Sequence, residues 1–481
     1  QGLEVTNFSG WEAQPAMSAL LDAYELSRDK RWLDEAAWLV EQFLEWRADR
    51  RAVVNYEGRI KPQWYRIKRY NIFYVSPFRK YDPSDESTIK TDRGWESLYF
   101  SDINHDGLFL SPIIRFSLLS SSIIEYKLLN MTIIKEARNN IDSHDEEWVD
   151  IGFGKGYYIF PRNSPFFLDG VEMPVNEAAI FGTALVLFYE ATGEEKYLTR
   201  AVSMVRNWLD YVSYEGGRLR QPYATGIWGK GWDSSNSPSV NTPVAPANTA
   251  HESFHKASLT ISFLNLLLRN IDDVDIRSFR DSFVLLLEES SSSGNQISFF
   301  PMYIDMTMPE DSHHVHNPAS FSGFAEISDT RFWRLMYLMA YAETQGAYTH
   351  VSTLTTTLRY MPEAMEEVPA VEVGQETISP VSIGGELPES CLLTADRDMV
   401  AHIVFRRASP KHNRLFLSPS PEIERGIRLE AKPDGTHTGH AYLRAGDCVK
   451  WRWVLTGTPE HSQPTGSENV ITLTTYSLTD D

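Results

Sequence analysis

The sequence predicts a mainly α-helical protein: an (α/α) toroid, or incomplete barrel, of helical hairpins over residues 1–365, followed by an antiparallel β-sandwich over residues 366–481. Two observations predict this fold class. One helical hairpin occurs twice with matching residues, and after Met361 the pattern changes from helical periodicity to short β-rich runs. The length of 481 residues also exceeds the size at which a single hydrophobic core usually stays undivided.

The repeated hairpin is the most direct indication of the toroid. Its residues recur at a constant offset, so that Tyr24 to Leu44 matches Tyr189 to Leu209. Each copy reads as a helix, a short polar turn and a second helix with apolar residues at three- and four-residue steps. One hairpin cannot bury its own apolar face, so recurring hairpins predict a stack or ring. Such a ring, with long aromatic-rich loops between its hairpins, has a wide groove at one end that suits a polymer chain.

Further hairpins are expected along the N-terminal part. The first spans about Trp11 to Arg47, and a long segment without helical pattern follows it to about Phe100. The other expected helical segments are 108–120 with a partner within 122–139, 176–211 as the second copy of the repeat, 253–270 with a partner around 276–289, and a hairpin that begins near Arg331.

The C-terminal part shows alternating β-rich runs separated by turn residues, which is typical of an antiparallel sandwich. The expected strands are 399–405, 414–417, 426–429, 440–443, 448–455 and 469–476. Both cysteines, Cys391 and Cys448, fall in this part. They either form a disulfide, as in exported proteins, or remain buried thiols.

The amino-acid composition limits the kinds of partner that the protein is expected to bind. The formal net charge of −20 argues against nucleic acid or an anionic membrane as the partner. No apolar stretch is long enough to span a bilayer, and Gln1 suits the first residue left after a signal peptide is removed. The sequence therefore predicts a periplasmic or secreted protein, as a monomer or small homo-oligomer.

Positive charge is concentrated between Lys61 and Tyr81. This stretch holds six basic residues, no acidic residue and seven aromatic residues. Aromatic faces stack on sugar rings, while Arg and Lys pair with carboxylate or sulfate groups. The stretch therefore indicates an anionic glycan; the alternative is a loop whose cations balance acidic residues elsewhere on the surface.

Polar residues gather where three helices are expected to begin. His105 lies just before the helix at 108–120, and His251 just before the helix at 253–270. At the mouth of a helical ring such residues point into the groove; the alternative for each histidine is a capping or packing role. Asn176 is expected as the N-cap of the second repeat helix, with its amide also able to face the groove.

Three short motifs carry a family resemblance. They are Pro174-x-Asn176-x-Ala178-Ala179-x-x-Gly182-x-Ala184-Leu185-x-x-Phe188-Tyr189-x-Ala191-Thr192-Gly193, His105-Asp106-Gly107-x5-Pro112-x-x-Arg115-Phe116, and Asn248-x-x-His251. Together they resemble the (α/α)-toroid polysaccharide lyases, in particular the alginate and glucuronan lyases. The resemblance covers residues 1–365 in organisation and these motifs in detail. The Tyr-x-Ala-Thr-Gly turn is shared by many (α/α) glycan enzymes and therefore specifies the fold more than the reaction.

The resemblance implies β-elimination at a uronic acid. The enzyme must neutralise the substrate carboxylate, remove the C5 proton and protonate the leaving oxygen at C4. Carried onto this chain, Asn176 and Asn248 are the matching positions for neutralisation, with His105 and His251 as base or carboxylate partner. No motif identifies the catalytic tyrosine; Tyr303 is preferred over Tyr158, Tyr223 and Tyr65. The substrate expected first is alginate or polyglucuronate, followed by ulvan or a glycosaminoglycan.

Residues expected to bind neighbouring sugars are aromatic or basic. They are Trp64, Tyr65, Arg66, Arg69, Arg93, Tyr158, Tyr223, Trp228, Lys230, Trp232 and His255. No cofactor is expected. The histidines of His313-His314-Val315-His316 lack the acid and spacing of usual zinc motifs, although some lyases of related architecture carry a metal, which leaves a divalent ion open.

Other functions fit parts of the same pattern. An (α/α) glycoside hydrolase acting on an acidic glycan needs two carboxylates, and the candidates are Asp102, Asp106, Glu177, Asp233 and Glu252. An unsaturated-uronyl hydrolase combines hydrolysis with an anionic sugar but usually lacks a C-terminal β domain. A uronate epimerase begins with the same proton removal as a lyase. A non-catalytic glycan-binding protein would share the groove and the aromatic residues but would not need clustered histidines.

Overall fold

The computed structural model divides by backbone contacts into two units, Gln1–Phe283 and Val284–Asp481, and each is described by itself. The structure describes residues 10–66, 80–81, 88–91, 94–97, 99–216, 218–252, 254–292, 359, 371–378, 393–394, 399–406, 414–420, 423–428, 430–431, 436–443, 448–449 and 470–478. The expected domain boundary at residues 365 and 366 lies outside the described residues.

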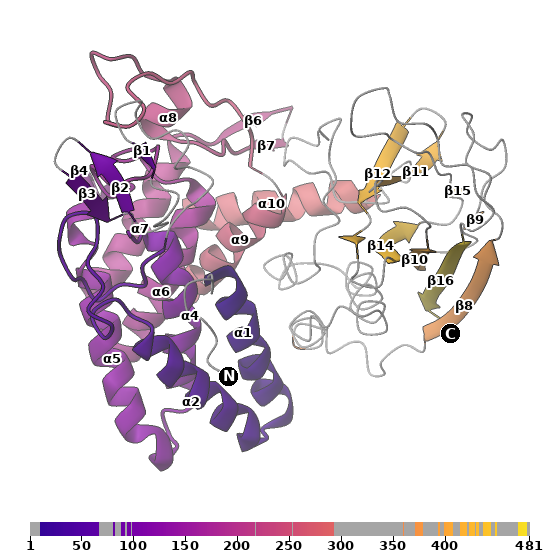
Figure 1. Ribbon diagram of the computed structural model, residues 1–481, viewed down its shortest axis with the longest axis horizontal. Helices are drawn as coiled ribbons and strands as arrows, with labels where there is room; N and C mark the ends of the chain where they lie inside the picture. Colours follow the sequence, from indigo (N-terminus) through magenta and orange to yellow (C-terminus); the bar gives the residue numbers. More distant parts are fainter. Residues whose placement is uncertain are drawn as a thin grey trace. The chain divides into compact units, whose positions relative to one another are not determined.

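The first unit is built from helical hairpins (Figure 1). Their helices are α1 (Gly10–Ser27) and α2 (Lys30–Glu45), α4 (Ile103–Leu119) and α5 (Lys127–Asp142), α6 (Val175–Thr192) and α7 (Glu195–Leu209), and α9 (Phe254–Leu268) and α10 (Val274–Ser292), of which α10 belongs to this unit as far as Phe283. The two copies of the repeated sequence form α1–α2 and α6–α7, which confirms the predicted hairpins. The hairpin expected near Arg331 lies outside the described residues.

The helices form an inner row and an outer row. Helices α1, α4, α6 and α9 pack on one another in that order, while α2, α5 and α7 each pack against the inner helix of their own hairpin. Burial follows this division: in α6 almost every residue from Val175 to Phe188 is buried, whereas α7 buries one side only. This order of packing is consistent with an (α/α) toroid.

Glycines bring the starts of the inner helices together. A Cβ on Gly107 of α4 would lie 3.0 Å from the backbone of Phe181 in α6, and one on Gly182 of α6 would lie 2.7 Å from the ring of Phe263 in α9. At the start of α1, a Cβ on Gly10 would lie 3.2 Å from the carbonyl oxygen of His105. A Cβ at any of these positions would force a neighbouring atom to shift, and each contact falls within the first three turns of both helices. The inner helices therefore begin at the same end of the unit.

Short strands fill the connections between hairpins. They are β1 (Lys80–Tyr81), β2 (Thr88–Thr91) and β3 (Gly94–Ser97) before α4, β4 (Trp148–Gly152) and β5 (Lys155–Tyr158) before α6, and β6 (Ser213–Glu215) and β7 (Arg218–Arg220) after α7, followed by the short helix α8 (Gly226–Lys230). The sequence did not predict these elements. No helix among the described residues is both long and apolar enough to cross a membrane.

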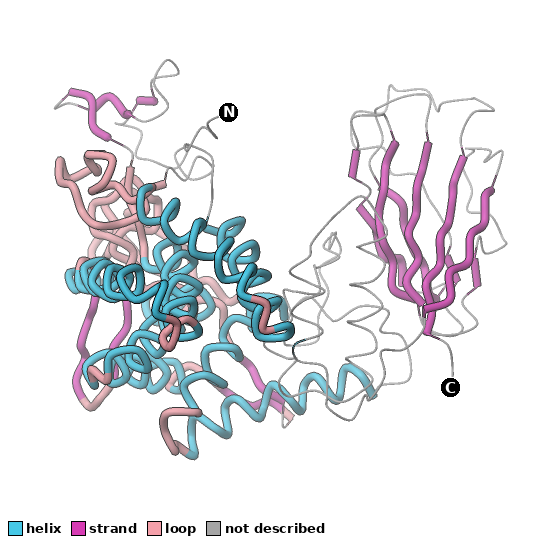
Figure 2. The backbone as a smooth tube through the Cα atoms, turned by 90° about the horizontal axis from the view of Figure 1, so that it is seen from below, coloured by secondary structure: helices cyan, strands magenta, loops and turns pink. Residues whose placement is uncertain are grey.

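The second unit contains an antiparallel sheet in the order β13-β14-β10-β16-β8, and its strands are drawn in magenta in Figure 2. Its strands are β8 (Val371–Ile378), β10 (Met399–Arg406), β13 (Glu430–Ala431), β14 (Thr436–Leu443) and β16 (Val470–Leu478), and the pairs β11 (Arg414–Ser420) with β12 (Ile423–Arg428) and β9 (Leu393–Thr394) with β15 (Cys448–Val449) lie outside it. Each predicted strand coincides at least in part with an observed one. The packing of two sheets into a sandwich stays a prediction, as does the state of Cys391, which lies outside the described residues.

Candidate active site

Helix α4 begins at Ile103, five residues before the predicted start, because Asp102 caps it. The Asp102 carboxylate accepts a hydrogen bond from the backbone N–H of His105 (3.0 Å) and forms an ion pair with Arg66. His105 therefore lies in the first turn of α4, buried and edge-on to Phe109 (ring centroids 5.4 Å apart). Arg66 is thus engaged by the protein itself, and its contact with a neighbouring uronate stays a prediction.

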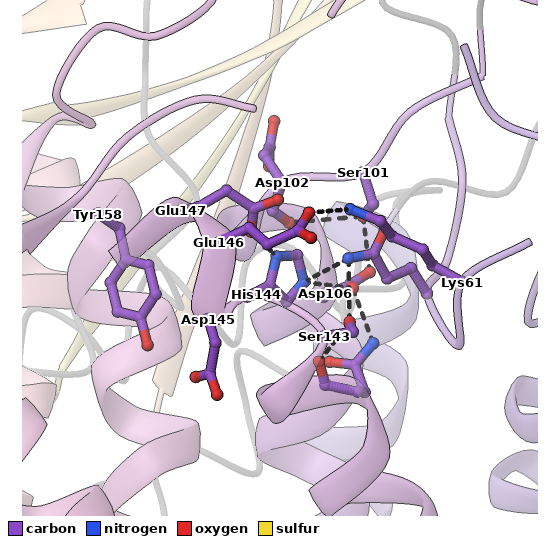
Figure 3. Close-up of polar contacts among 12 residues, drawn as sticks. Lys61, Ser101, Asp102, Asp106, Ser143, His144, Asp145, Glu146, Glu147 and Tyr158 are labelled. Atoms are coloured by element: carbon purple, nitrogen blue, oxygen red, sulfur yellow. Dashed lines mark hydrogen bonds and ion pairs between the residues drawn. The ribbon is translucent and has the colours of Figure 1, made fainter. Parts of the chain in front are cut away.

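Asp106, one turn further along α4, is the centre of a buried network (Figure 3). Its carboxylate accepts hydrogen bonds from the backbone N–H of Trp64 (3.0 Å), Ser101 Oγ (2.7 Å), Asn140 Nδ2 (2.7 Å) and His144 Nε2 (2.7 Å). Each of its two oxygens accepts two hydrogen bonds, so neither is available to a substrate. The carboxylate supports the fold and is a poor candidate for the acid or base of a hydrolase.

His144 is completely buried between two carboxylates. Its Nδ1 contacts Glu147 and its Nε2 contacts Asp106. Burial alone would lower the pKa of His144, but the negative charge of Glu147 and the hydrogen bond to Asp106 outweigh it and raise the pKa to about 10. The imidazole is therefore protonated at neutral pH and balances part of the buried negative charge.

Helix α6 begins at Val175 with Pro174 as its N-cap, so the prediction that Asn176 is the N-cap was wrong. The carbonyl oxygen of Pro174 already accepts the backbone N–H of Ala178 (2.9 Å), which places Asn176 inside the first turn. The Asn176 side chain is 1% exposed, and its Oδ1 accepts no hydrogen bond within the described part of the chain. Oε2 of the neighbouring Glu177 is likewise buried without a partner there. A buried polar atom of this kind is completed by a water molecule or a ligand, and Oδ1 of Asn140 in the network around Asp106 is another example.

A short antiparallel pairing lies between the segments 221–223 and 250–252. Pro222 is bridged to His251, and the backbone N–H groups of Tyr223 and Glu252 donate to Ala250 (2.9 Å) and Gln221 (3.0 Å). Because side chains alternate along paired extended segments, Tyr223 and Glu252 share one face, and His251 lies on the opposite one.

Tyr223 is surrounded by charged and aromatic groups. Its ring lies edge-on to Trp228 (centroids 5.6 Å apart), and Lys256 Nζ lies 4.3 Å from its centroid. Burial raises the pKa of Tyr223 above its usual value of 10, and the nearby negative charges of Glu177 and Glu252 raise it further. The phenol is therefore protonated at neutral pH, beside one carboxylate from the start of α6 and one from the segment before α9.

The buried carboxylate of Glu172 positions the segment from Tyr223 to Gly226. Glu172 accepts hydrogen bonds from Thr225 Oγ1 (2.6 Å) and Asn207 Nδ2 (2.9 Å), and burial raises its pKa. Gly226, at φ 55°, lies directly against this carboxylate, where a Cβ would approach to 2.0 Å. A side chain at this position would displace the start of α8, which carries Trp228.

Several residues expected to contact sugars are buried in the protein. Trp64 stacks on Phe109 (5.0 Å) and donates from Nε1 to the carbonyl oxygen of Phe43 (2.7 Å). Tyr158 is buried beside Arg200, and Trp232 donates to the carbonyl oxygen of Thr242 (2.7 Å). These contacts leave too little ring surface for a sugar, which corrects the expectation for all three.

The remaining candidate residues fall into two groups: those that the structure describes and those that lie outside the described residues. Tyr65 accepts a hydrogen bond from the backbone N–H of Lys61 (2.8 Å), and Asn248 accepts one from the backbone N–H of Ala250 (3.1 Å). Tyr65, Asn248 and Trp228 are partly exposed. Lys230 is exposed. Candidates outside the described residues are Arg69, Arg93, Tyr303, the side chain of His255, and the histidines His313, His314 and His316. Their roles stay predictions. Among the described residues, no group of three His, Cys, Asp or Glu residues is arranged to hold a metal ion.

The structure adds two residues that the sequence did not suggest. Gln221 is 1% exposed, and neither polar atom of its amide has a hydrogen-bond partner among the described residues. Lys256 lies over Tyr223 from the first turn of α9. No sequence signal distinguishes either one, since each depends on the pairing of 221–223 with the segment before α9.

Comparisons with known proteins leave the family open. No protein-family model and no curated protein matches the chain. Among solved structures, the chain is similar to the GH76A α-1,6-mannanase of Salegentibacter sp. HEL1_6 (12% identity, TM-score 0.40, covering 75% of this chain and 90% of that one). It is also similar to the unsaturated glucuronyl hydrolase of Bacillus sp. GL1 (13%, 0.39, 74% and 74%) and to the Lin0763 protein of Listeria innocua (11%, 0.41, 75% and 86%). Similarity at these sequence identities and TM-scores does not indicate a reaction.

Proposed function

We propose that this protein is a polysaccharide lyase that cleaves a uronic-acid-containing polysaccharide, such as alginate, glucuronan, ulvan or a glycosaminoglycan, by β-elimination. The observation that carries the proposal is the buried, unpartnered amide oxygen of Asn176, one residue from a carboxylate that acts on Tyr223. An amide that bonds to nothing in the described protein is available to a ligand. A periplasmic or secreted location, with the polymer outside the cell, fits this activity.

The reaction needs help at the substrate carboxylate. The C5 proton is weakly acidic while the adjacent carboxylate is ionised, and the negative charge that develops on removal of the proton must be stabilised. The Asn176 side chain can donate a hydrogen bond to that carboxylate from its amide Nδ2, while the unpartnered Oδ1 can accept one from a sugar hydroxyl. The free backbone N–H groups at the start of α6 add positive potential at the same place.

Proton transfer is assigned to Glu177 and Tyr223. The carboxylate of Glu177 takes the C5 proton, the C4–O bond breaks as the C4–C5 double bond forms, and the protonated phenol of Tyr223 gives its proton to the leaving oxygen. The unpartnered Oε2 of Glu177 and the raised pKa of Tyr223 support these roles. His251, on the opposite face from Tyr223, and His105, packed against Phe109, are less well placed.

A glycoside hydrolase acting on an acidic glycan is the second candidate. Glu177 and Glu252 both act electrostatically on Tyr223, so two carboxylates from different segments lie near one phenol. An acid and a base on opposite sides of a glycosidic bond are what hydrolysis requires. The three other carboxylates considered for this role are engaged elsewhere: Asp102 with Arg66, Asp106 with His144, and the exposed Asp233 with the backbone N–H of Ser235 (2.8 Å).

The test is an ultraviolet absorbance time course on alginate, polyglucuronate, ulvan, hyaluronan and a neutral glucan. β-Elimination produces a conjugated C4–C5 double bond, which hydrolysis does not. We expect absorbance to rise on one or more of the uronate polymers and to stay flat on the neutral glucan. New reducing ends without absorbance would replace the lyase by the hydrolase, and tight binding without either product would indicate a glycan-binding protein.

Replacing Tyr223 by phenylalanine is expected to lower kcat on the active polymer by about 10²–10⁴-fold, because the variant lacks the proton donor but keeps the ring. KM should change little, since the contacts with Trp228 and Lys256 involve the ring and not the hydroxyl. Steady-state kinetics by absorbance measure both constants. An unchanged kcat would remove Tyr223 from the mechanism.

A further inference from the structure

Lys256 carries a positive charge whose placement the fold does not explain. It lies in the first turn of α9, where the helix dipole disfavours a cation. Within the described part of the chain its ammonium group forms no ion pair with a carboxylate; the contact recorded for it is with the face of the Tyr223 ring, 4.3 Å from the centroid. A partly exposed lysine that is held over an aromatic face and not paired with an acid keeps its charge available to a ligand.

The negative charges near Tyr223 are a second reason to expect a cation that binds the ligand. Glu177 and Glu252 are close enough to Tyr223 for their charges to raise its pKa. A uronate that enters this place brings a further negative charge and is repelled by both carboxylates. The amide of Asn176 is neutral, so it cannot offset that repulsion by itself.

We propose that Lys256 binds the carboxylate of the substrate and thereby makes the site selective for acidic over neutral sugars. The proposal rests on the proposed function in one respect, namely that the ligand is a uronate. The Tyr223 ring holds the ammonium group in place from one side, and the substrate carboxylate approaches it from another. A charge-assisted hydrogen bond of this kind is among the stronger polar contacts in proteins.

The experiment compares binding of acidic and neutral sugars that differ in one group. The probes are the tetrasaccharides of β-1,4-linked glucuronate and β-1,4-linked mannuronate, each with its carboxyl-reduced neutral counterpart, titrated calorimetrically at fixed ionic strength. Every protein carries Tyr223→Phe so that the acidic probes are bound and not cleaved, and wild type here means the protein with Lys256 in that background. The variants are Lys256→Met and Lys256→Arg. Lys135→Met is the matched control, because it removes the same charge from an exposed site on the outer helix α5.

We expect the wild-type protein to prefer at least one acidic tetrasaccharide over its neutral counterpart. Lys256→Met should weaken binding of that acid about 10-fold or more and leave the neutral sugar unchanged, while Lys256→Arg retains the preference and Lys135→Met behaves as wild type. Equal losses for acidic and neutral sugars would show that Lys256 only supports Tyr223 and would overturn the proposal. An absent wild-type preference, or no measurable binding of either acid, would overturn it too.

This test is independent of the reaction. If the absorbance assay stays flat but the preference for the acidic sugar depends on Lys256, the lyase proposal fails and the role of Lys256 stands. If absorbance rises but Lys256→Met binds the acidic sugar as wild type does, the reverse holds. Circular dichroism of the Lys256→Met variant, with Lys256→Arg as the conservative replacement, separates a loss of folding from a loss of charge recognition.

Discussion

Replacing Asn176 by alanine is expected to lower kcat/KM on the active uronate polymer by about 10²–10³-fold, the loss typical of removing one hydrogen-bond donor from a developing oxyanion. Stability should stay nearly unchanged, because Oδ1 of Asn176 is buried and accepts no hydrogen bond from the described residues. Removing a buried polar group that is unsatisfied costs little and can even stabilise the protein. Absorbance kinetics and a urea unfolding curve measure the two effects.

Asn140 provides the matched control for this prediction. It is equally buried, but its Nδ2 donates to the carbonyl oxygen of Pro62 (2.8 Å) and to Asp106 Oδ2 (2.7 Å). Asn140→Ala should therefore lower the free energy of unfolding by about 2–3 kcal/mol, with a small effect on kcat/KM where the protein is folded. A large stability loss in Asn176→Ala, or full activity in it, would contradict the assigned role.

Replacing His144 by glutamine is expected to destabilise the first unit by about 3–5 kcal/mol at neutral pH, as happens when one partner of a buried ion pair is removed. The variant leaves Asp106 and Glu147 buried without the charge that His144 supplies. Thermal and urea unfolding at pH 7 measure the loss. Asp106 keeps its bonds from Trp64, Ser101 and Asn140, which supports a folded variant for comparison.

The pH dependence of stability tests the same site with the wild-type protein. The pKa of His144 is raised from the usual 6.5 in the unfolded chain to about 10 in the folded protein, so the folded state binds the proton more tightly. The stabilisation is therefore fully present below about pH 6.5 and is lost as pH rises through about 10. Unfolding curves between these limits should show a decline in the wild type that His144→Gln lacks. Parallel curves for the two proteins would show that His144 is neutral.

The helical hairpins were predictable because their signal is local. Apolar residues at three- and four-residue steps specify which side of a helix is buried, and the repeated pattern specified that hairpins stack. The predicted start of α4 was five residues too late. Asn104, His105 and Asp106 are polar but buried, so a pattern of apolar residues at helical spacing does not include them. The N-cap of α6 was misplaced by two residues, because Pro174 takes the extended conformation that the cap requires.

Contact residues were less predictable than helices. Trp64 and Trp228 look alike in sequence, each in an aromatic-rich loop, yet one packs into the core while the other lies beside Tyr223. Whether an aromatic ring faces the core or a groove depends on what packs against it. Tyr223 appeared among the candidate tyrosines without being preferred, because nothing near it in sequence shows that Glu177 and Glu252 lie close to it.

The sequence by itself determined the helical hairpins, the antiparallel strands and the polar residues at the helix starts, because each depends on neighbours a few positions away. Only the tertiary structure decided which of those polar residues are already engaged and which remain for a ligand. Asp102 and Asp106 bond to Arg66 and His144, far from them in the chain, whereas Oδ1 of Asn176 has no such partner among the described residues. The physical reason is that a hydrogen bond or ion pair is made through space, and residues far apart in sequence meet only after the helices have packed.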